Sequence, residues 1–222
     1  MIPWKAQALA TAVGGELSPQ VDPNAELTGL VIDSRLAGPG TVFVALEGTR
    51  VDGIDFVDAA VAAGSPLAVV GRPVPGPTVL VPDPVAALGQ IAEVALRRAR
   101  VANPDLKVVA ITGSVGKTTT KDLVARIFRS QGPTVASFGS LNNHLGVPLT
   151  VARAGLDTRY LVVEVGANHP GEIAGLARIA PPDVAVVLGV GKSHLGTFGS
   201  IEAAAATKAE LVAGMEFGGM AV

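Results

Sequence analysis

The second half of the chain alternates short apolar runs with longer segments in which apolar residues recur at helical spacing. A run such as Val108-Val109-Ala110-Ile111 is typical of a buried strand, whereas the periodic segments predict amphipathic helices. Strands that alternate with helices favour a mainly parallel sheet covered on both faces. The pattern predicts strands at 107–112, 133–136, 159–164 and 184–188 and helices at 117–130, 147–154, 170–179 and 200–214.

The first half shows the same α/β alternation, interrupted more often by proline and glycine. The stretch from Arg72 to Pro77 is a connection, and Pro84 fits the first turn of a long helix. Asn103-Pro104 ends that helix, so we place a domain boundary there, with one α/β domain at 1–102 and a second at 103–222. The elements predicted for the first domain are helices at 5–13, 55–63 and 84–101 and strands at 27–33, 41–46, 67–70 and 79–81.

Composition narrows the class of protein. The chain has 222 residues, 49% of them hydrophobic and 16% charged, which is enough to bury a substantial core. A net charge of −2 gives no electrostatic reason to expect nucleic acid or an anionic membrane as a partner. Zero cysteines exclude a disulfide scaffold and a thiolate metal site. With no signal-peptide pattern and no run of 18 apolar residues, we expect a cytoplasmic protein without a membrane span.

The most specific motif is the loop that follows strand 107–112. It reads Gly113-Ser114-Val115-Gly116-Lys117-Thr118-Thr119 and opens the predicted helix 117–130. Glycines let successive N–H groups point at one anion, and the helix N-terminus adds partial positive charge. Lys117 can reach the terminal phosphates of a nucleotide, and the Thr118 hydroxyl can ligate Mg²⁺. The loop therefore predicts nucleotide binding, although Ile111 stands where the common pattern has glycine; the alternative is an ordinary glycine-rich turn.

Three further side chains follow predicted strands or lie near them. Glu164 ends the apolar strand 159–164, where a carboxylate is costly unless it is paired or metal-bound. His194 lies in a polar loop after strand 184–188, and its imidazole could ligate a divalent ion or be structural. Lys208 lies on an alanine-rich helix, where a solvated surface lysine is the ordinary interpretation. Glu164 is the strongest metal-ligand candidate of the three, with a salt-bridged strand end as its alternative.

Two polar segments leave their roles open. The amides of Asn142-Asn143 can cap a helix or hold a phosphoryl oxygen, and the residues alone do not choose between these roles. In the first domain, Ser34 and Arg35 follow a strand and could bind a phosphorylated ligand. Turn capping by Asp33 and Ser34 is an equal alternative on local grounds.

Together these segments resemble the Mur ligase family over nearly the whole chain. The phosphate loop of that family likewise lacks the first glycine of the common pattern. The residues that carry the resemblance are Thr112–Thr119 in the loop; Asp33-Ser34-Arg35, Gly40, Phe43–Leu46, Gly48 and Asp52-Gly53 in the first domain; and Leu141–Thr150, Glu164–Ile173, His194-Leu195, Phe198-Gly199-Ser200 and Lys208-Ala209-Glu210 in the second.

The resemblance implies an N-terminal nucleotide-sugar-binding α/β domain followed by a P-loop domain. It implies an ATP-dependent ligase of the EC 6.3.2 type that uses ATP and Mg²⁺. Leu141–Thr150 and Glu164–Ile173 are most similar to the member that adds D-alanyl-D-alanine to a UDP-N-acetylmuramoyl-tripeptide through an acyl phosphate in peptidoglycan synthesis. Those two substrates are the implied partners, and we expect a monomer for the full-length protein.

The resemblance also assigns roles to individual residues. Lys117, Asn143 and His194 would be catalytic, with Asn142 the alternative to Asn143 for contacting the transferred phosphoryl group. Metal ligands would be Thr118, Glu164, His194 and Lys208, the last as a carbamate because an ammonium group cannot coordinate a cation. Binding of the UDP-sugar substrate would involve Ser34, Arg35 and Asn142.

The chain also departs from the family pattern. Family members carry further sequence that completes the central sheet and adds a C-terminal domain, so we expect this chain to correspond to the first half and to be inactive by itself. We also expect a mobile or displaced segment after about residue 200. Within the same class, the alternatives are the diaminopimelate- or lysine-adding Mur ligase and folylpolyglutamate synthase. In another class, the alternative is a non-catalytic nucleotide-binding module.

Overall fold

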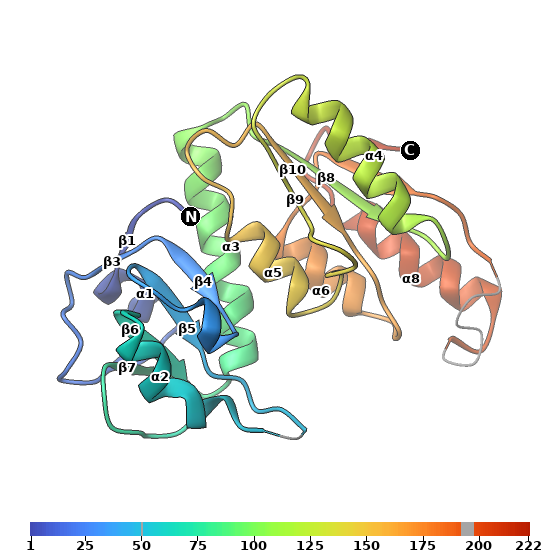
Figure 1. Cartoon of the computed structure of the whole chain (residues 1–222). Helices are drawn as coiled ribbons and strands as arrows, with labels where there is room; N and C mark the ends of the chain where they lie inside the picture. The colour runs from blue at the N-terminus through green and yellow to red at the C-terminus, as the bar shows by residue number, and fades with distance from the viewer. Residues whose placement is uncertain (50, 192–197) are drawn as a thin grey trace. The chain divides into compact units, whose positions relative to one another are not determined.

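A computed structural model describes residues 1–49, 51–191 and 198–222. The chain divides into two compact units, Met1–Ala95 and Leu96–Val222, and each is described by itself. The boundary between them falls within helix α3 (Pro84–Ala102), whereas the sequence prediction places a boundary after residue 102. Figure 1 shows the course of the chain through both units.

Unit 1 is built on a five-stranded sheet in the order β2-β7-β6-β5-β4. Its strands pair in parallel except for β2 with β7, and a second, two-stranded antiparallel sheet joins β1 to β3. Helix α2 contributes Val57 and Ala60 to a core that contains Phe43 and Val70. The bounds are β1 Trp4–Lys5, α1 Ala6–Ala12, β2 Glu16–Leu17, β3 Glu26–Leu27, β4 Gly29–Val31, η1 Ser34–Leu36, β5 Thr41–Val44, η2 Gly53–Phe56, α2 Val57–Ala62, β6 Leu67–Val70 and β7 Thr78–Leu80.

Unit 2 contains a five-stranded sheet in the order β12-β11-β8-β10-β9, in which every pair of neighbouring strands is parallel. The strand and helix bounds are β8 Lys107–Thr112, α4 Lys117–Arg129, β9 Thr134–Ala136, α5 Gly146–Val151, β10 Tyr160–Glu164, α6 Glu172–Ile179, β11 Val184–Val187, α8 Ile201–Ala213 and β12 Met220–Ala221. The predicted α/β class with a mainly parallel sheet is confirmed.

Helices cover both faces of this sheet. Helix α4 lies on one face, and α5, α6 and α8 lie on the other (Figure 1). On the α4 face, Val109, Ile111 and Val162 of the sheet pack with Ala125 and Ala136. Burial on both faces explains why the central strands are apolar runs without a polar alternation.

Strand β8 is the topological switch point of the sheet. The chain moves from β8 outward to β9, returns through β10, and then continues on the far side of β8 with β11. Ligands of open α/β sheets bind beyond the carboxyl ends of the strands at such a point. The loop after Thr112 therefore lies where the fold favours a ligand.

The end of the chain differs from the sequence expectation. Helix α8 packs against α6 and the sheet, and β12 pairs in parallel with β11, so the segment after residue 200 is docked rather than displaced in the part that the structure describes. Leu211 and Ala204 of α8 are fully buried. None of the helices among the described residues is both long and apolar enough to cross a membrane.

Candidate nucleotide-binding site

The loop between β8 and α4 has the backbone of an anion-binding turn. Gly116, which precedes the first turn of α4, has a φ of +82°, a conformation that residues with a side chain rarely adopt. Gly113 has no room for a side chain, because an added Cβ would lie 2.9 Å from the Leu188 Cβ. The two glycines therefore allow the chain to leave the sheet and place the N-terminus of α4 beside it.

Side chains on this loop are held in place by its neighbours. The Lys117 Nζ donates to the Gly113 carbonyl at 2.9 Å, so the lysine lies folded across the loop. Ser114 is buried; its hydroxyl accepts from the Gly191 N–H at 2.8 Å, and its own N–H donates to the Gly189 carbonyl at 3.0 Å. Ser114 thus ties the loop to the segment that follows β11.

A cleft of about 330 Å³ opens at the start of α4. Most of its lining side chains are polar, and they come from the loop and helix start, the segment after β9 and the end of β10. It is lined by Gly116, Lys117, Thr118, Thr119, Ser140, Asn142 and Glu164. The cleft brings together six residues that the sequence singled out, together with Ser140.

Glu164 is the carboxylate of this cleft. It is 1% exposed, and its Oε1 accepts from the Asn142 Nδ2 at 2.8 Å. Its Oε2 is fully buried and has no hydrogen-bond partner among the described residues. A buried carboxylate oxygen without a donor is costly, and a cation in the cleft would relieve that cost.

The donor set fits Mg²⁺. Mg²⁺ takes oxygen ligands and is usually held by one or two carboxylates together with substrate phosphates. Glu164 and the Thr118 hydroxyl line the same cleft and supply such oxygens. Among residues 1–49, 51–191 and 198–222, no three His, Asp, Glu or Cys side chains gather as a metal cage.

The two asparagines have different surroundings. The Asn143 Oδ1 accepts from the Leu145 and Gly146 N–H groups, which caps the start of α5, and its side chain is exposed. Asn142 lines the cleft and donates to Glu164. The geometry therefore favours Asn142 over Asn143 for a contact with a bound phosphoryl group, while the role of either residue stays a prediction.

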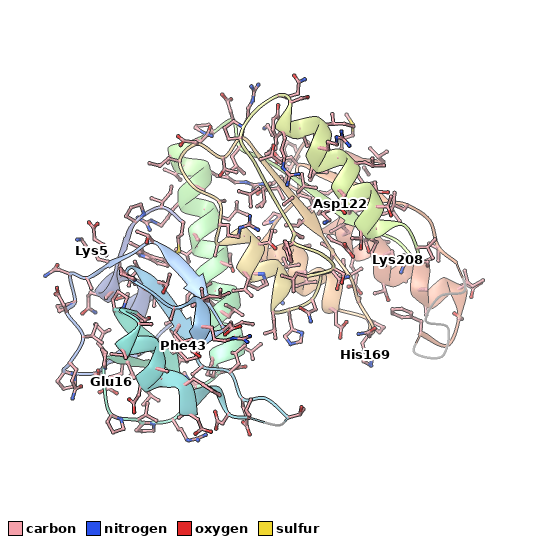
Figure 2. All side chains as sticks on the ribbon, viewed as in Figure 1. Lys5, Glu16, Phe43, Asp122, His169 and Lys208 are labelled. Atoms are coloured by element: carbon pink, nitrogen blue, oxygen red, sulfur yellow. The ribbon has the colours of Figure 1, made fainter. Side chains whose placement is uncertain are left out.

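Lys208 is not the solvated lysine that its helix suggests. It lies on α8 (Figure 2), is 6% exposed, and its Nζ lies 5.5 Å from the centre of the Phe198 ring. Burial lowers the pKa of Lys208 below its ordinary value, and the nearby charge of Lys117 lowers it further. His194, the other predicted ligand from this part of the chain, lies outside the described residues.

Ser34 and Arg35 form part of a tight turn in unit 1. The Asp33 carboxylate accepts from the Arg35 N–H and pairs with its guanidinium at 2.6 Å. These contacts hold the pKa of Asp33 at about 2, the Arg35 side chain contributing most. Capping by Asp33 is thus confirmed, and the Arg35 side chain remains 86% exposed and accessible to a ligand.

Comparison with known proteins decides the family. Residues 26–103 match the pattern described as "Mur ligase family, catalytic domain", and residues 111–222 match "Mur ligase middle domain". The chain belongs to the Mur ligase family. Within this Mur ligase chain, the second match covers the phosphate loop and Glu164, and the first covers Ser34 and Arg35.

Two curated relatives with the same name are similar to this chain over nearly its whole length. The chain is 45% identical, over 95% of its length, to UDP-N-acetylmuramoyl-tripeptide–D-alanyl-D-alanine ligase of Mycobacterium bovis and 38% identical, over 100% of its length, to that of Escherichia coli. It covers 46% and 48% of these relatives, so it spans about half the length of the curated relatives that it matches.

Solved structures agree with the sequence relatives. A crystal structure of MurF from Acinetobacter baumannii superposes with a TM-score of 0.89 at 38% identity, covering 99% of this chain and 48% of that one. MurF ligase from Thermotoga maritima in complex with ADP gives 0.77 at 34% identity, covering 87% of this chain and 44% of that one.

The structure also shows contacts that sequence reasoning missed. Glu210 of α8 accepts from the Gly171 and Ala174 N–H groups and so caps α6. Glu172 accepts from the Asn168 N–H, which lowers the pKa of Glu172 below its ordinary value. Lys121 of α4 is fully buried. A carboxylate early in a helix is a recognisable capping signal for Glu172, but no local pattern indicates the long-range contacts of Glu210 or the burial of Lys121.

Proposed function

We propose that this chain provides the ATP-binding and UDP-sugar-binding parts of an ATP-dependent ligase of the EC 6.3.2 type, which joins D-alanyl-D-alanine to UDP-N-acetylmuramoyl-tripeptide in peptidoglycan synthesis. The observation that carries the proposal is the cleft of unit 2, where the phosphate-loop lysine and Thr118 meet the half-satisfied carboxylate of Glu164. The chain is 34–45% identical to the proteins described above as UDP-N-acetylmuramoyl-tripeptide–D-alanyl-D-alanine ligase or MurF, and this similarity supports the substrate assignment.

The loop would bind the phosphates of ATP. Lys117 can exchange its bond to the Gly113 carbonyl for a phosphate oxygen without leaving the loop, since both lie at the start of α4. Its charge, together with the loop N–H groups, would stabilise the negative charge on the phosphoryl group during transfer. Asn142 adds an amide donor from the opposite side of the cleft, where it also holds Glu164.

Glu164 and Thr118 would hold Mg²⁺. When bound, Mg²⁺ neutralises phosphate charge and orients the transferred phosphoryl group. His194 and a carbamylated Lys208 are our candidates for a second ion. The lowered pKa of Lys208 supports this assignment, because a carbamate forms only on the neutral amine.

The chemistry proposed is amide formation in two steps. The terminal carboxylate of the UDP-N-acetylmuramoyl-tripeptide attacks the γ-phosphorus of ATP, ADP leaves with the electrons of the broken bond, and an acyl phosphate forms. The amine of D-alanyl-D-alanine then attacks the acyl carbon, loses a proton, and displaces inorganic phosphate. Ser34 and Arg35 of unit 1 are proposed to bind the UDP-sugar end. We also propose that the protein acts in the cytoplasm and that the complete enzyme is a monomer.

Ligand binding to the chain tests the proposal. Calorimetry should show binding of ATP with Mg²⁺ and separate binding of UDP-N-acetylmuramoyl-tripeptide in preference to the dipeptide form or a folate. Arg35→Ala should weaken only the UDP-sugar ligand. Arg72→Ala is the matched control, since Arg72 is a half-exposed arginine of the same unit that pairs with Asp52. Equal loss with both variants, or a shift in ATP affinity with Arg35→Ala, would contradict the assignment of unit 1.

The alternatives predict different preferences. A diaminopimelate- or lysine-adding ligase would prefer the UDP-N-acetylmuramoyl-dipeptide, and a folylpolyglutamate synthase would bind folate. One diaminopimelate ligase structure matches with a TM-score of 0.58 at 21% identity, which indicates a shared fold alone. A non-catalytic nucleotide-binding module would bind ATP but need no carboxylate such as Glu164, whose unpaired oxygen favours the ligase.

A further inference from the structure

Lys121 is a charged side chain that the site described above does not use. It lies one helical turn after Lys117 on α4 and is 1% exposed, yet it is not among the residues that line the cleft. Burying an ammonium group is strongly unfavourable unless it is hydrogen-bonded, and an apolar side chain would fill a helix–sheet interface without that cost. The contacts of Lys121 therefore need a reason other than packing.

Two acceptors meet the Lys121 Nζ. One is Oδ1 of the adjacent Asp122, a residue of α4 whose side chain is 66% exposed. The other is the main-chain carbonyl of Ser137 at 2.9 Å, in a contact that is buried. An exposed ion pair does not require a buried lysine, because both partners could meet in water. The contact that requires burial is the one with Ser137, which directly follows β9.

Ser137 connects Lys121 to Glu164, which lines the cleft. Its N–H donates to the Val162 carbonyl at 3.1 Å, and its hydroxyl accepts from the Glu164 N–H at 3.1 Å. It thus extends the pairing of β9 with β10, which as a ladder ends at Ala136 and Val162. The backbone N–H of Glu164 is therefore hydrogen-bonded to the side chain of Ser137, and the main-chain carbonyl of Ser137 is hydrogen-bonded to Lys121.

We propose that Lys121 is a positioning residue: through Ser137 it fixes the end of β10 so that the Glu164 carboxylate faces the phosphate loop. The inference rests on the proposed function, because it assumes that Glu164 serves the nucleotide and its metal ion. Since Lys117 and Lys121 lie on the same helix, α4 carries both the phosphate-binding group and the group that holds the opposite wall of the cleft. The distance between the two walls is then set by one rigid element.

The neighbouring residue supplies a matched control. The Arg153 Nη1 donates to the carbonyl of Ala136, one residue before Ser137, at 3.1 Å. It is also a cation on a main-chain carbonyl at the end of β9, but no hydrogen bond in the described part of the chain leads from Ala136 to Glu164. If any loss of support at this strand end disturbed the cleft, Arg153→Met would act like Lys121→Met. If Lys121 instead acts on Glu164 through Ser137, Arg153→Met would leave the cleft undisturbed.

The first experiment needs no ligand. Hydrogen exchange of the Glu164 amide is measured in the wild-type chain and in Lys121→Met, Ser137→Ala and Arg153→Met. Losing one hydrogen bond in this route should speed exchange of that amide about three- to tenfold in the first two variants and leave it unchanged in the third. Ser137→Ala removes the acceptor of the Glu164 N–H itself and so gives the acceleration expected when this route is broken, whereas Lys121→Met tests the step from Lys121 to Ser137. Unchanged exchange in Lys121→Met or in Ser137→Ala, or equal acceleration in Arg153→Met, would overturn the proposal.

The second experiment links the route to the nucleotide. The Mg²⁺ concentration that half-saturates ATP binding should rise about three- to tenfold in Lys121→Met and Ser137→Ala, while ATP affinity without Mg²⁺ stays close to wild type. In a Glu164→Gln background, Lys121→Met should add no further change, because it acts through Glu164. A purely structural lysine would lower the melting temperature and leave this midpoint unmoved.

Failure of the two proposals can be told apart. If Glu164→Gln itself leaves the Mg²⁺ midpoint unchanged, the proposed function of the cleft is wrong, and amide exchange alone decides whether Lys121 positions Glu164. If Glu164→Gln shifts the midpoint and Lys121→Met does not, the function stands and the positioning role is refuted.

Discussion

Replacing Glu164 with glutamine should change stability and nucleotide binding in opposite directions. In the protein without ligand, one carboxylate oxygen of Glu164 accepts from Asn142 and the other is buried without a donor among the described residues. Glutamine has the same shape, keeps a carbonyl oxygen for Asn142 and removes the charge. The substitution therefore relieves a cost in the free protein and removes the cation-binding group from the cleft.

The magnitudes follow from these contacts. An unsatisfied buried polar atom costs about 1–3 kcal/mol, so Glu164→Gln should raise the free energy of unfolding of unit 2 by about 1 kcal/mol, allowing for a new amide group that also needs a partner. For a chain of this size that corresponds to a rise in melting temperature of roughly 2–4 °C. Loss of a charge-assisted interaction with bound Mg²⁺ should weaken Mg²⁺–ATP binding by about 1.5–3 kcal/mol, roughly ten- to a hundredfold in Kd.

The chain offers a separate optical probe for each unit. Its single tyrosine, Tyr160, lies on β10 and stacks on Phe128 in unit 2, whereas its single tryptophan, Trp4, lies on β1 in unit 1. Near-ultraviolet circular dichroism of Tyr160 in a Trp4→Phe background should follow unfolding of unit 2 alone, and Trp4 fluorescence should be unaffected by Glu164→Gln. Calorimetric titration with ATP, with and without Mg²⁺, gives the change in the Kd of Mg²⁺–ATP.

The matched control is Asp157→Asn, which neutralises an exposed carboxylate of the same unit. It should change neither the melting temperature nor the Kd. A Glu164→Gln variant that is destabilised by more than about 1 kcal/mol would show that the carboxylate is satisfied in the free protein. Unchanged Mg²⁺–ATP affinity would show that Glu164 does not face the bound cation, and either result would refute the reasoning.

Further outcomes concern the phosphate loop, the turn in unit 1 and the buried lysine. Lys117→Ala should weaken ATP binding by at least about tenfold, roughly 1.4 kcal/mol, in calorimetry, with an unchanged far-ultraviolet spectrum; an unchanged Kd would exclude the loop. Gly116→Ala should lower the free energy of unfolding in urea by about 1–2 kcal/mol, because residue 116 has a positive φ; equal stability would show that the turn relaxes. The folded pKa of Asp33, about 2, lies below its ordinary value, so the stability contributed by its contacts with Arg35 is complete above about pH 4 and is lost as the pH falls through about 2. In Arg35→Ala, NMR titration of the Asp33 carboxyl carbon should move back toward about 4, and an unmoved titration would contradict the assigned cause. With ¹³C-bicarbonate, a carbamate resonance should appear that Lys208→Arg lacks and that acid removes, because burial and Lys117 lower the pKa of Lys208 and favour the neutral amine; a spectrum without it would leave Lys208 an unmodified amine.

Local patterns in the sequence predicted most of the helices and strands and the phosphate loop. The predicted strands at 67–70 and 107–112 have the observed bounds, and the predicted helix at 117–130 ends one residue beyond the observed α4. Apolar runs and helical periodicity depend on residues close together in the chain, as do the glycine turn and the lysine that follows it. The short strands β1 and β2 were missed, because two residues are too few to form a periodic pattern.

The composition of the cleft depended on the tertiary structure. Placement of β10 between β8 and β9 puts Glu164 opposite Ile111 and beside the segment that carries Asn142 and Ser137. The sequence offered both Asn142 and Asn143 for the phosphoryl contact, and only the fold separates the residue in the cleft from the helix cap.

For this protein, the sequence by itself determined the α/β class, the alternation of strands and helices in the second half of the chain, and the glycine loop that resembles a phosphate-binding loop. Tertiary structure decided that Lys121 and Lys208 are buried, that one oxygen of Glu164 has no donor in the described residues, and that Ser137 joins α4 to β10. The physical reason is that the burial and the hydrogen-bond partners of a side chain are set by segments far away in the sequence. The same lysine on a helix is a solvated cation or a buried link according to which strand packs against it.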